Sequence, residues 1–269
     1  MNNLKSFLRD VRDNNYGIPE GTDIDQVVHE MIQNIGSIDD ELRDRLIYGT
    51  LHKWIMNEEL SIELVRKVLY ITLDDDHLFC GIGDIDQDTV FTRSFSALFI
   101  PLAFHYNDIF NYLTEQEYEY IYSRMRKYYE LEKDYRGYIL DKGWAHSIAH
   151  AADSLHSISS ASYYSQKHLL VILELIREKA CVSNYYFIND EDERMAAVVI
   201  QIVKRNILKE DVLINWVQQL GCIERIAYPR YDIMRGNIKN FLRSVYFRLL
   251  DISGTEGINK EIIKTLNQL

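Results

Sequence analysis

Two histidines and an aspartate recur at helical spacing in one segment of the sequence. His146, His150 and Asp153 are four and three residues apart, so on an α-helix their side chains lie along one stripe. Two imidazoles at this spacing can bind one divalent metal ion, with Asp153 as a third ligand or as the group that orients an imidazole. The same trio suits acid–base chemistry, with the carboxylate holding a histidine as general base.

A structural interpretation of the trio is equally open. Buried polar side chains must be hydrogen-bonded, and two imidazoles and a carboxylate in line can form a polar seam between helices. The zincin motif also requires a glutamate directly after its first histidine, where this chain has Ser147. The spacing therefore leaves three hypotheses for His146, His150 and Asp153: a metal site, an acid–base site and a structural seam.

The segment around the trio carries almost no charge. From Gly143 to Gln166 the only formally charged residue is Asp153, whereas the overall composition would place about six charged residues there. Alanine and serine dominate instead. Because exposed helices normally carry lysine and glutamate, we expect a helix from about Gly143 to Ile158 at the centre of the fold, closely packed by its neighbours.

Two arginines accompany this segment. Arg136 precedes Gly137, and Arg93 lies near the start of an apolar helix. Each guanidinium can bind an anion or pair with a buried carboxylate. A separate feature is the acidic loop, Asp74–Asp88, which holds six aspartates in fifteen residues. Its last three aspartates have the spacing of a calcium loop, but the glycine and the closing glutamate of that motif are missing. We interpret it as a solvated acidic turn.

The sequence resembles a bacterial family known as domain of unknown function 2785, most clearly over residues 90–205. Four motifs carry the resemblance: Phe91-Thr-Arg-Ser-Phe95, Asp134-Tyr-Arg-Gly137, Gly143-Trp-Ala-His-Ser-Ile-Ala-His-Ala-Ala-Asp153 and Glu191-Asp-Glu-Arg194. The resemblance implies an all-helical protein with no assigned activity. It also implies a shared ligand pocket at the family's marked polar positions, which here are Arg93, Arg136, Trp144, His146, His150, Asp153, Glu193 and Arg194.

Helical periodicity runs through nearly every long segment, and capping signals mark several helix starts. Thr114-Glu-Gln-Glu117, for example, has the pattern of a capping box. We count about a dozen predicted helices with short joints, and the best strand candidate, Tyr185–Ile188, is short. The predicted class is all-α, with helix pairs stacked into an armadillo/HEAT-like curved array, or alternatively a compact irregular bundle. No linker-like stretch interrupts the chain, so we predict a single domain over 1–269.

The amino-acid composition limits the classes of partner and the environment that we expect for this protein. Acidic residues outnumber basic ones 41 to 30, giving a formal charge of −11. Duplex binding needs a cationic face, so no nucleic-acid partner is predicted. Three cysteines without a CxxC pair favour neither a disulfide framework nor a cysteine zinc site. No apolar run approaches the roughly 20 residues of a membrane span, and no signal peptide is recognisable. We expect a cytoplasmic protein that does not enter membranes.

These observations give two functional hypotheses from different classes. The first is a binding protein whose polar pocket around His146, His150 and Asp153 receives a small ligand or a protein segment. The alternative is a metal-dependent enzyme of hydrolase type that uses the same residues as ligands and base. The sequence identifies neither the substrate nor the oligomeric state.

Overall fold

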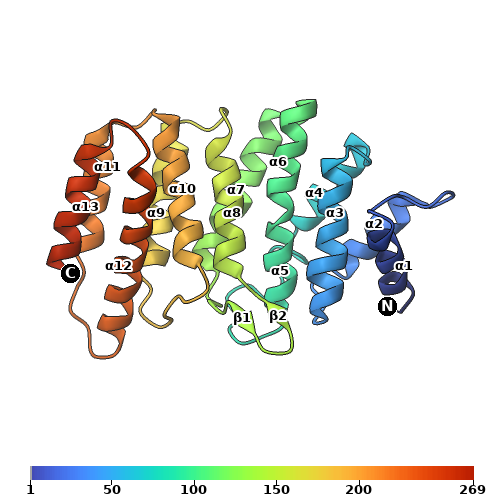
Figure 1. Ribbon diagram of the computed structural model, residues 1–269, viewed down its shortest axis with the longest axis horizontal. Coiled ribbons are helices and arrows are strands. Elements are labelled where there is room, and N and C mark those ends of the chain that lie inside the picture. The colour runs from blue at the N-terminus through green and yellow to red at the C-terminus, as the bar shows by residue number, and fades with distance from the viewer. Residues whose placement is uncertain (1) are drawn as a thin grey trace. The chain divides into compact units, whose positions relative to one another are not determined.

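The computed structural model describes residues 2–269, whose helices group into two compact units (Figure 1). The first unit ends at Ser154, and the second spans Leu155–Leu269. Helix α8 (Ser147–Ser160) begins in the first unit and ends in the second. The single-domain organisation of 1–269 stays a prediction.

The first unit is helical except for one short hairpin. Helix α4 packs on α2 and α6, and α3 continues directly from the π-helical segment η1. The elements in chain order are α1 (Asn2–Asp13), α2 (Ile24–Gln33), η1 (Glu41–Tyr48), α3 (Gly49–Met56), α4 (Ile62–Thr72), α5 (Thr89–Ala97), α6 (Phe99–Phe110), α7 (Glu115–Leu131), β1 (Tyr138–Ile139), β2 (Gly143–Trp144) and the start of α8.

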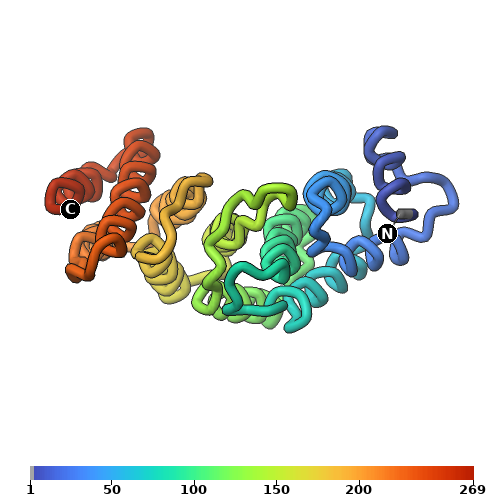
Figure 2. Tube along the Cα trace, turned by 90° about the horizontal axis from the view of Figure 1, so that it is seen from below, coloured from blue at the N-terminus to red at the C-terminus, as the bar shows by residue number. Residues whose placement is uncertain are grey.

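The second unit consists of packed helix pairs. Helix α10 lies beside α12, and α11 lies beside α13, as both views show (Figures 1 and 2). The elements are the end of α8, α9 (Gln166–Ala180), α10 (Glu191–Arg205), α11 (Glu210–Gly221), α12 (Arg230–Leu249) and α13 (Glu256–Gln268). None of the helices within residues 2–269 has the length and apolarity needed to cross a membrane.

The predicted all-α class is confirmed, since the described elements are helices apart from one short hairpin. Local sequence signals also mark helix starts correctly, as one example shows. At the start of α7, the Thr114 hydroxyl accepts the Glu117 N–H at 3.3 Å, and the Glu117 carboxylate accepts the Thr114 N–H at 2.8 Å. This capping box satisfies donors that a helix start leaves unpaired. The strand candidate Tyr185–Ile188 is irregular. Helix pairs are present, while their armadillo/HEAT-like stacking stays a prediction.

The helix predicted from Gly143 is wrong in its first four residues. Gly143 and Trp144 instead pair antiparallel with Ile139 and Tyr138, and α8 begins at Ser147. Gly143 has φ +78° and His146 has φ +47°, in the left-handed region that a right-handed helix cannot include. Backbone conformation at these two positions therefore overrides the helix-like composition of the segment.

A buried ion pair fixes the middle of the first unit. Arg93 on α5 and Glu132 just after α7 are both fully buried, with Arg93 Nε 2.5 Å from Glu132 Oε2 and Arg93 Nη2 3.0 Å from Glu132 Oε1. The remaining Arg93 donors reach the backbone oxygens of Cys80 and Asp84. Burial alone lowers the pKa of a guanidinium, but the bonds to Glu132 outweigh it and raise the pKa of Arg93.

Removing one partner of this pair should lower the free energy of unfolding far more than replacing both partners with apolar side chains. Glu132→Gln leaves a buried guanidinium without its counter-charge, so we expect the free energy of unfolding to fall by about 3–5 kcal/mol. In the double variant Arg93→Met/Glu132→Met, both charges are gone and much of that loss should be recovered. Urea denaturation of the three proteins checks this. A single-variant loss below about 1 kcal/mol would contradict a structural role.

Candidate functional site

His150 and Asp153 lie on one half-buried face of α8. The opposite face of the helix, formed by Ile148, Ala151 and Ala152, is buried, as expected for a closely packed, charge-poor segment. His146 precedes the helix and is also half-buried. The three side chains are therefore neither sealed inside the core nor fully solvated.

Aromatic rings connect this face to the hairpin. The Trp144 indole stacks on the His146 imidazole, with centroids 4.4 Å apart and planes 22° apart. The His146 ring meets His150 edge to face at 5.5 Å, and His150 meets Phe95 of α5 at 5.0 Å. Trp144 is 38% exposed, whereas Phe95 is buried. The rings thus form a continuous array, here called the ring stack, from solvent to core.

The hairpin and α8 meet at the left-handed residue His146. Its N–H donates to Arg136 O at 3.1 Å, which closes the end of the hairpin, and its carbonyl accepts the His150 N–H at 2.9 Å, which opens the helix. The Ser147 hydroxyl donates to the Asp134 carbonyl. His146 therefore turns the chain from strand to helix while its ring stays between Trp144 and His150.

A buried arginine that the sequence analysis missed supports the hairpin from behind. Arg43 of η1 is fully buried, and it donates to Ser37 O at 2.6 Å and to Lys142 O at 2.8 Å. Its guanidinium lies 4.2 Å from the Phe91 ring centroid, a cation–π contact. One feature of the sequence could have revealed this burial: Arg43 lies four residues before the apolar Ile47, on the same buried face of the helix.

Asp44 is the acidic neighbour of Arg43. Its Oδ1 lies 2.7 Å from Arg43 Nε. Burial raises the pKa of Asp44 to about 6, although Arg43 acts in the opposite direction. The hairpin lies close by, since a Cβ added at Gly143 would come within 2.7 Å of Asp40 Cβ and 3.4 Å of Asp44 Oδ2. Only glycine fits the hairpin at this approach.

Arg136 pairs with a buried carboxylate, one of the two roles predicted for it. Arg136 Nε is 2.8 Å from Asp134 Oδ1, and Asp134 is buried. Arg136 Nη2 also donates to Gln87 O at 2.8 Å, and the Asp86 N–H donates to Asp134 at 3.1 Å. The base of the hairpin is in this way fastened to the acidic loop.

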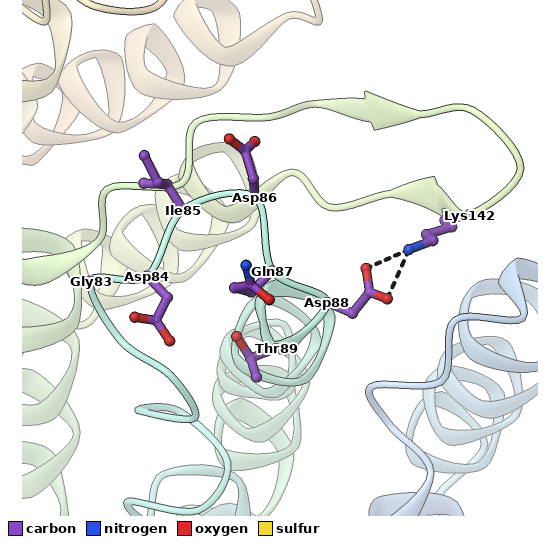
Figure 3. Close-up of a pocket in the computed structure, with 8 residues that line it drawn as sticks. All are labelled: Gly83, Asp84, Ile85, Asp86, Gln87, Asp88, Thr89 and Lys142. Carbon is purple, nitrogen blue, oxygen red and sulfur yellow. Dashed lines mark hydrogen bonds and ion pairs between the residues drawn. The ribbon is translucent and has the colours of Figure 1, made fainter.

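An open pocket of about 740 Å³ lies along the acidic loop (Figure 3). At one end Lys142 of the hairpin forms an ion pair with Asp88 at 2.8 Å. Figure 3 shows Ile85 and Asp86 on the side of the loop toward the hairpin, while Asp84 points to the other side. The pocket is lined by Gly83, Asp84, Ile85, Asp86, Gln87, Asp88, Thr89 and Lys142.

The structure brings only part of the predicted residue set together. Trp144, His146 and His150 are in ring contact, and Asp153 follows them along α8. The side-chain bonds of Arg93 go instead to Glu132, to the acidic loop and to the Thr89 hydroxyl at the start of α5.

Two further predicted residues lie in the second unit. Glu193 accepts from Arg248 at 2.7 Å, and Arg194 is exposed in the first turn of α10. Their membership of a site with the histidines stays a prediction. Within residues 2–269, no group of three or more His, Cys, Asp or Glu side chains is arranged to hold a metal ion. The predicted metal role of the trio stays untested.

The backbone at His146 gives a prediction about stability. His146→Ala and His146→Gly both remove the imidazole, but only glycine adopts φ +47° without a steric penalty. We therefore expect the glycine variant to be more stable than the alanine variant by about 1 kcal/mol. Urea denaturation measures the difference directly. An alanine variant at least as stable as the glycine variant would contradict the left-handed turn.

The raised pKa of Asp44 gives a prediction about pH. A carboxyl whose pKa is higher in the folded state contributes stability below its unfolded pKa, near 4, and loses it as the pH rises through about 6. Relative to Asp44→Asn, which does not titrate, the wild-type free energy of unfolding should fall by about 2.5 kcal/mol from pH 4 to pH 7.5. Denaturation curves at four pH values check this, and parallel profiles would contradict it.

Comparison with known proteins places these features in a family. No curated protein and no solved structure matches the chain. Residues 78–247, well over half of the chain, match the family described as "Protein of unknown function (DUF2785)". The match covers the acidic loop from Leu78, α5, the hairpin and α8, and hence both the ring stack and the pocket. The chain therefore belongs to the DUF2785 family.

Proposed function

We propose that this protein is a binding module that recognises its ligand at Trp144, His146, His150 and Asp153. One observation carries the proposal: the half-buried His146 imidazole stacks on a partly exposed indole and meets the His150 imidazole edge to face, and the left-handed backbone of His146 holds this middle ring. A non-glycine residue in this conformation costs free energy and is found preferentially at functional sites. Rings held in advance by packing lose little entropy when a ligand binds.

The side chains indicate what kind of ligand would fit. The indole offers a flat apolar face, the imidazoles donate or accept hydrogen bonds, and the Asp153 carboxylate accepts them. We expect a small molecule, or a protein segment, that presents a flat group beside a hydrogen-bond donor. Arg136, which already pairs with Asp134, supports the hairpin rather than the ligand.

The indole of Trp144 provides a spectroscopic probe that tests the proposal. The indole N–H groups of Trp54 and Trp216 are internal and donate to Tyr16 O and Leu173 O, each at 2.9 Å, whereas Trp144 is 38% exposed. The protein should give three indole N–H signals in a ¹⁵N NMR spectrum, with the Trp144 signal assigned by Trp144→Phe. Screening amino acids, nucleotides and sugar phosphates should yield a compound that shifts this signal and leaves the other two in place.

Variants then decide whether the trio is responsible. His150→Ala and Asp153→Asn should each weaken binding of that compound about ten-fold, which is the usual loss for one well-placed hydrogen bond. The matched control His29→Ala, on the exposed face of α2, should leave binding unchanged. Unchanged binding in both site variants would refute the proposal. Stoichiometric metal in the untagged protein, lost in a folded His146→Ala/His150→Ala variant, would favour the hydrolase hypothesis instead.

A further inference from the structure

The hairpin has two chemically different faces. Ile139, on the inner face, packs against Val90, Phe91 and Ala145. On the outer face Tyr138 pairs across the strands with Trp144, their ring centroids 5.0 Å apart. Leu140, two residues after Tyr138, is 79% exposed, and Tyr138 is 53% exposed.

Ile85 extends this exposed apolar surface onto the acidic loop. It is 57% exposed and precedes Asp86, whose carboxylate lies 3.6 Å from Arg136 at the base of the hairpin. In Figure 3 Ile85 and Asp86 lie on the side of the loop that faces the hairpin. We call Ile85, Tyr138, Leu140 and Trp144 the outer apolar face. Large apolar side chains gathered in this way on a surface are typical of an interaction site.

The charge around the outer apolar face identifies its partner. Residues 1–154 contain twenty-eight acidic and fifteen basic residues, a formal charge of −13, so the first unit carries more than the whole negative charge of the chain. Next to the outer apolar face, Asp141 directly follows Leu140, is exposed and forms no ion pair with any residue from 2 to 269. Asp86 points toward the hairpin, and its side chain is 76% exposed although it lies 3.6 Å from Arg136. An acidic partner would be repelled at this face, whereas a basic partner would be attracted to it.

We propose that the outer apolar face docks a basic protein segment in which lysine or arginine alternates with large apolar side chains. The apolar side chains cover Tyr138, Leu140 and Trp144, and the cationic side chains lie beside Asp86 and Asp141. An extended segment has the required geometry, since successive side chains point to opposite sides. This docking surface shares Trp144 with the proposed ligand site, whereas Ile85, Tyr138 and Leu140 have no part in the proposed function.

Three labelled peptides test the proposal on the full-length protein by fluorescence anisotropy. The probe is a nine-residue peptide of alternating lysine and leucine. In the first comparison peptide serine replaces leucine, and in the second glutamate replaces lysine. The lysine–leucine peptide should bind at least ten-fold more tightly than either of the other two, and high salt should weaken it.

Matched variants locate the binding. Leu140→Ser and Asp86→Asn/Asp141→Asn should each lower affinity for the lysine–leucine peptide about ten-fold. The controls Ile109→Ser, at an exposed position of α6, and Asp25→Asn/Glu30→Gln, on α2, remove the same chemistry elsewhere and should bind as wild type. His150→Ala should also bind as wild type, which separates this surface from the ligand site.

Any of three results would overturn the proposal. The first is equal binding of the lysine–serine peptide, which would indicate attraction by charge alone. The second is unchanged affinity in Leu140→Ser or in the double aspartate variant. The third is no binding of the lysine–leucine peptide at about 1 mM. Because all substituted side chains are exposed or half-exposed, circular dichroism should show wild-type folding in each variant.

Discussion

The first unit is organised by the need to satisfy a guanidinium that has no access to water. Arg93 can stay charged in the core only if every donor finds an acceptor, because an unpaired buried charge costs several kcal/mol. Glu132 supplies the counter-charge, and the carbonyl oxygens of Cys80 and Asp84 complete the shell. These acceptors come from the acidic loop and from the end of α7. The hydrogen bonds that satisfy Arg93 therefore also hold both segments in position.

A second buried guanidinium extends the same principle to the hairpin. Two-residue strands make too few backbone bonds to hold a fixed position by themselves. Arg43 donates to the carbonyl oxygen of Lys142, and Gly143 allows the hairpin to approach η1 closely. From there the chain reaches His146, whose left-handed backbone begins α8. The imidazoles of the ring stack therefore owe their placement to contacts on the inner side of the hairpin, where no ligand is expected.

The helices could be predicted from sequence because their signals are local. A capping box such as the one at Thr114 needs only four consecutive residues. The hairpin could not be predicted, since two-residue strands show no alternation and the segment around His146 is rich in the helix former alanine. The sequence placed His146 and His150 together for the wrong reason, a helical stripe, although their rings do meet. Contacts such as Arg93 with Glu132 join residues 39 positions apart, and no local pattern encodes them.

The buried ion pairs also determine which carboxylates of the first unit stay exposed without a counter-charge. Arg93 is neutralised by Glu132 inside the core, and Arg136 by Asp134 at its edge. Arg93 held in this way cannot compensate the carboxylates of the loop surface, and Arg136 shares its charge between Asp134 and Asp86. The same contacts that fasten the acidic loop to the hairpin therefore leave aspartates exposed beside an apolar hairpin face. A partner with positive charge covers such negatively charged apolar surface more favourably than an acidic one.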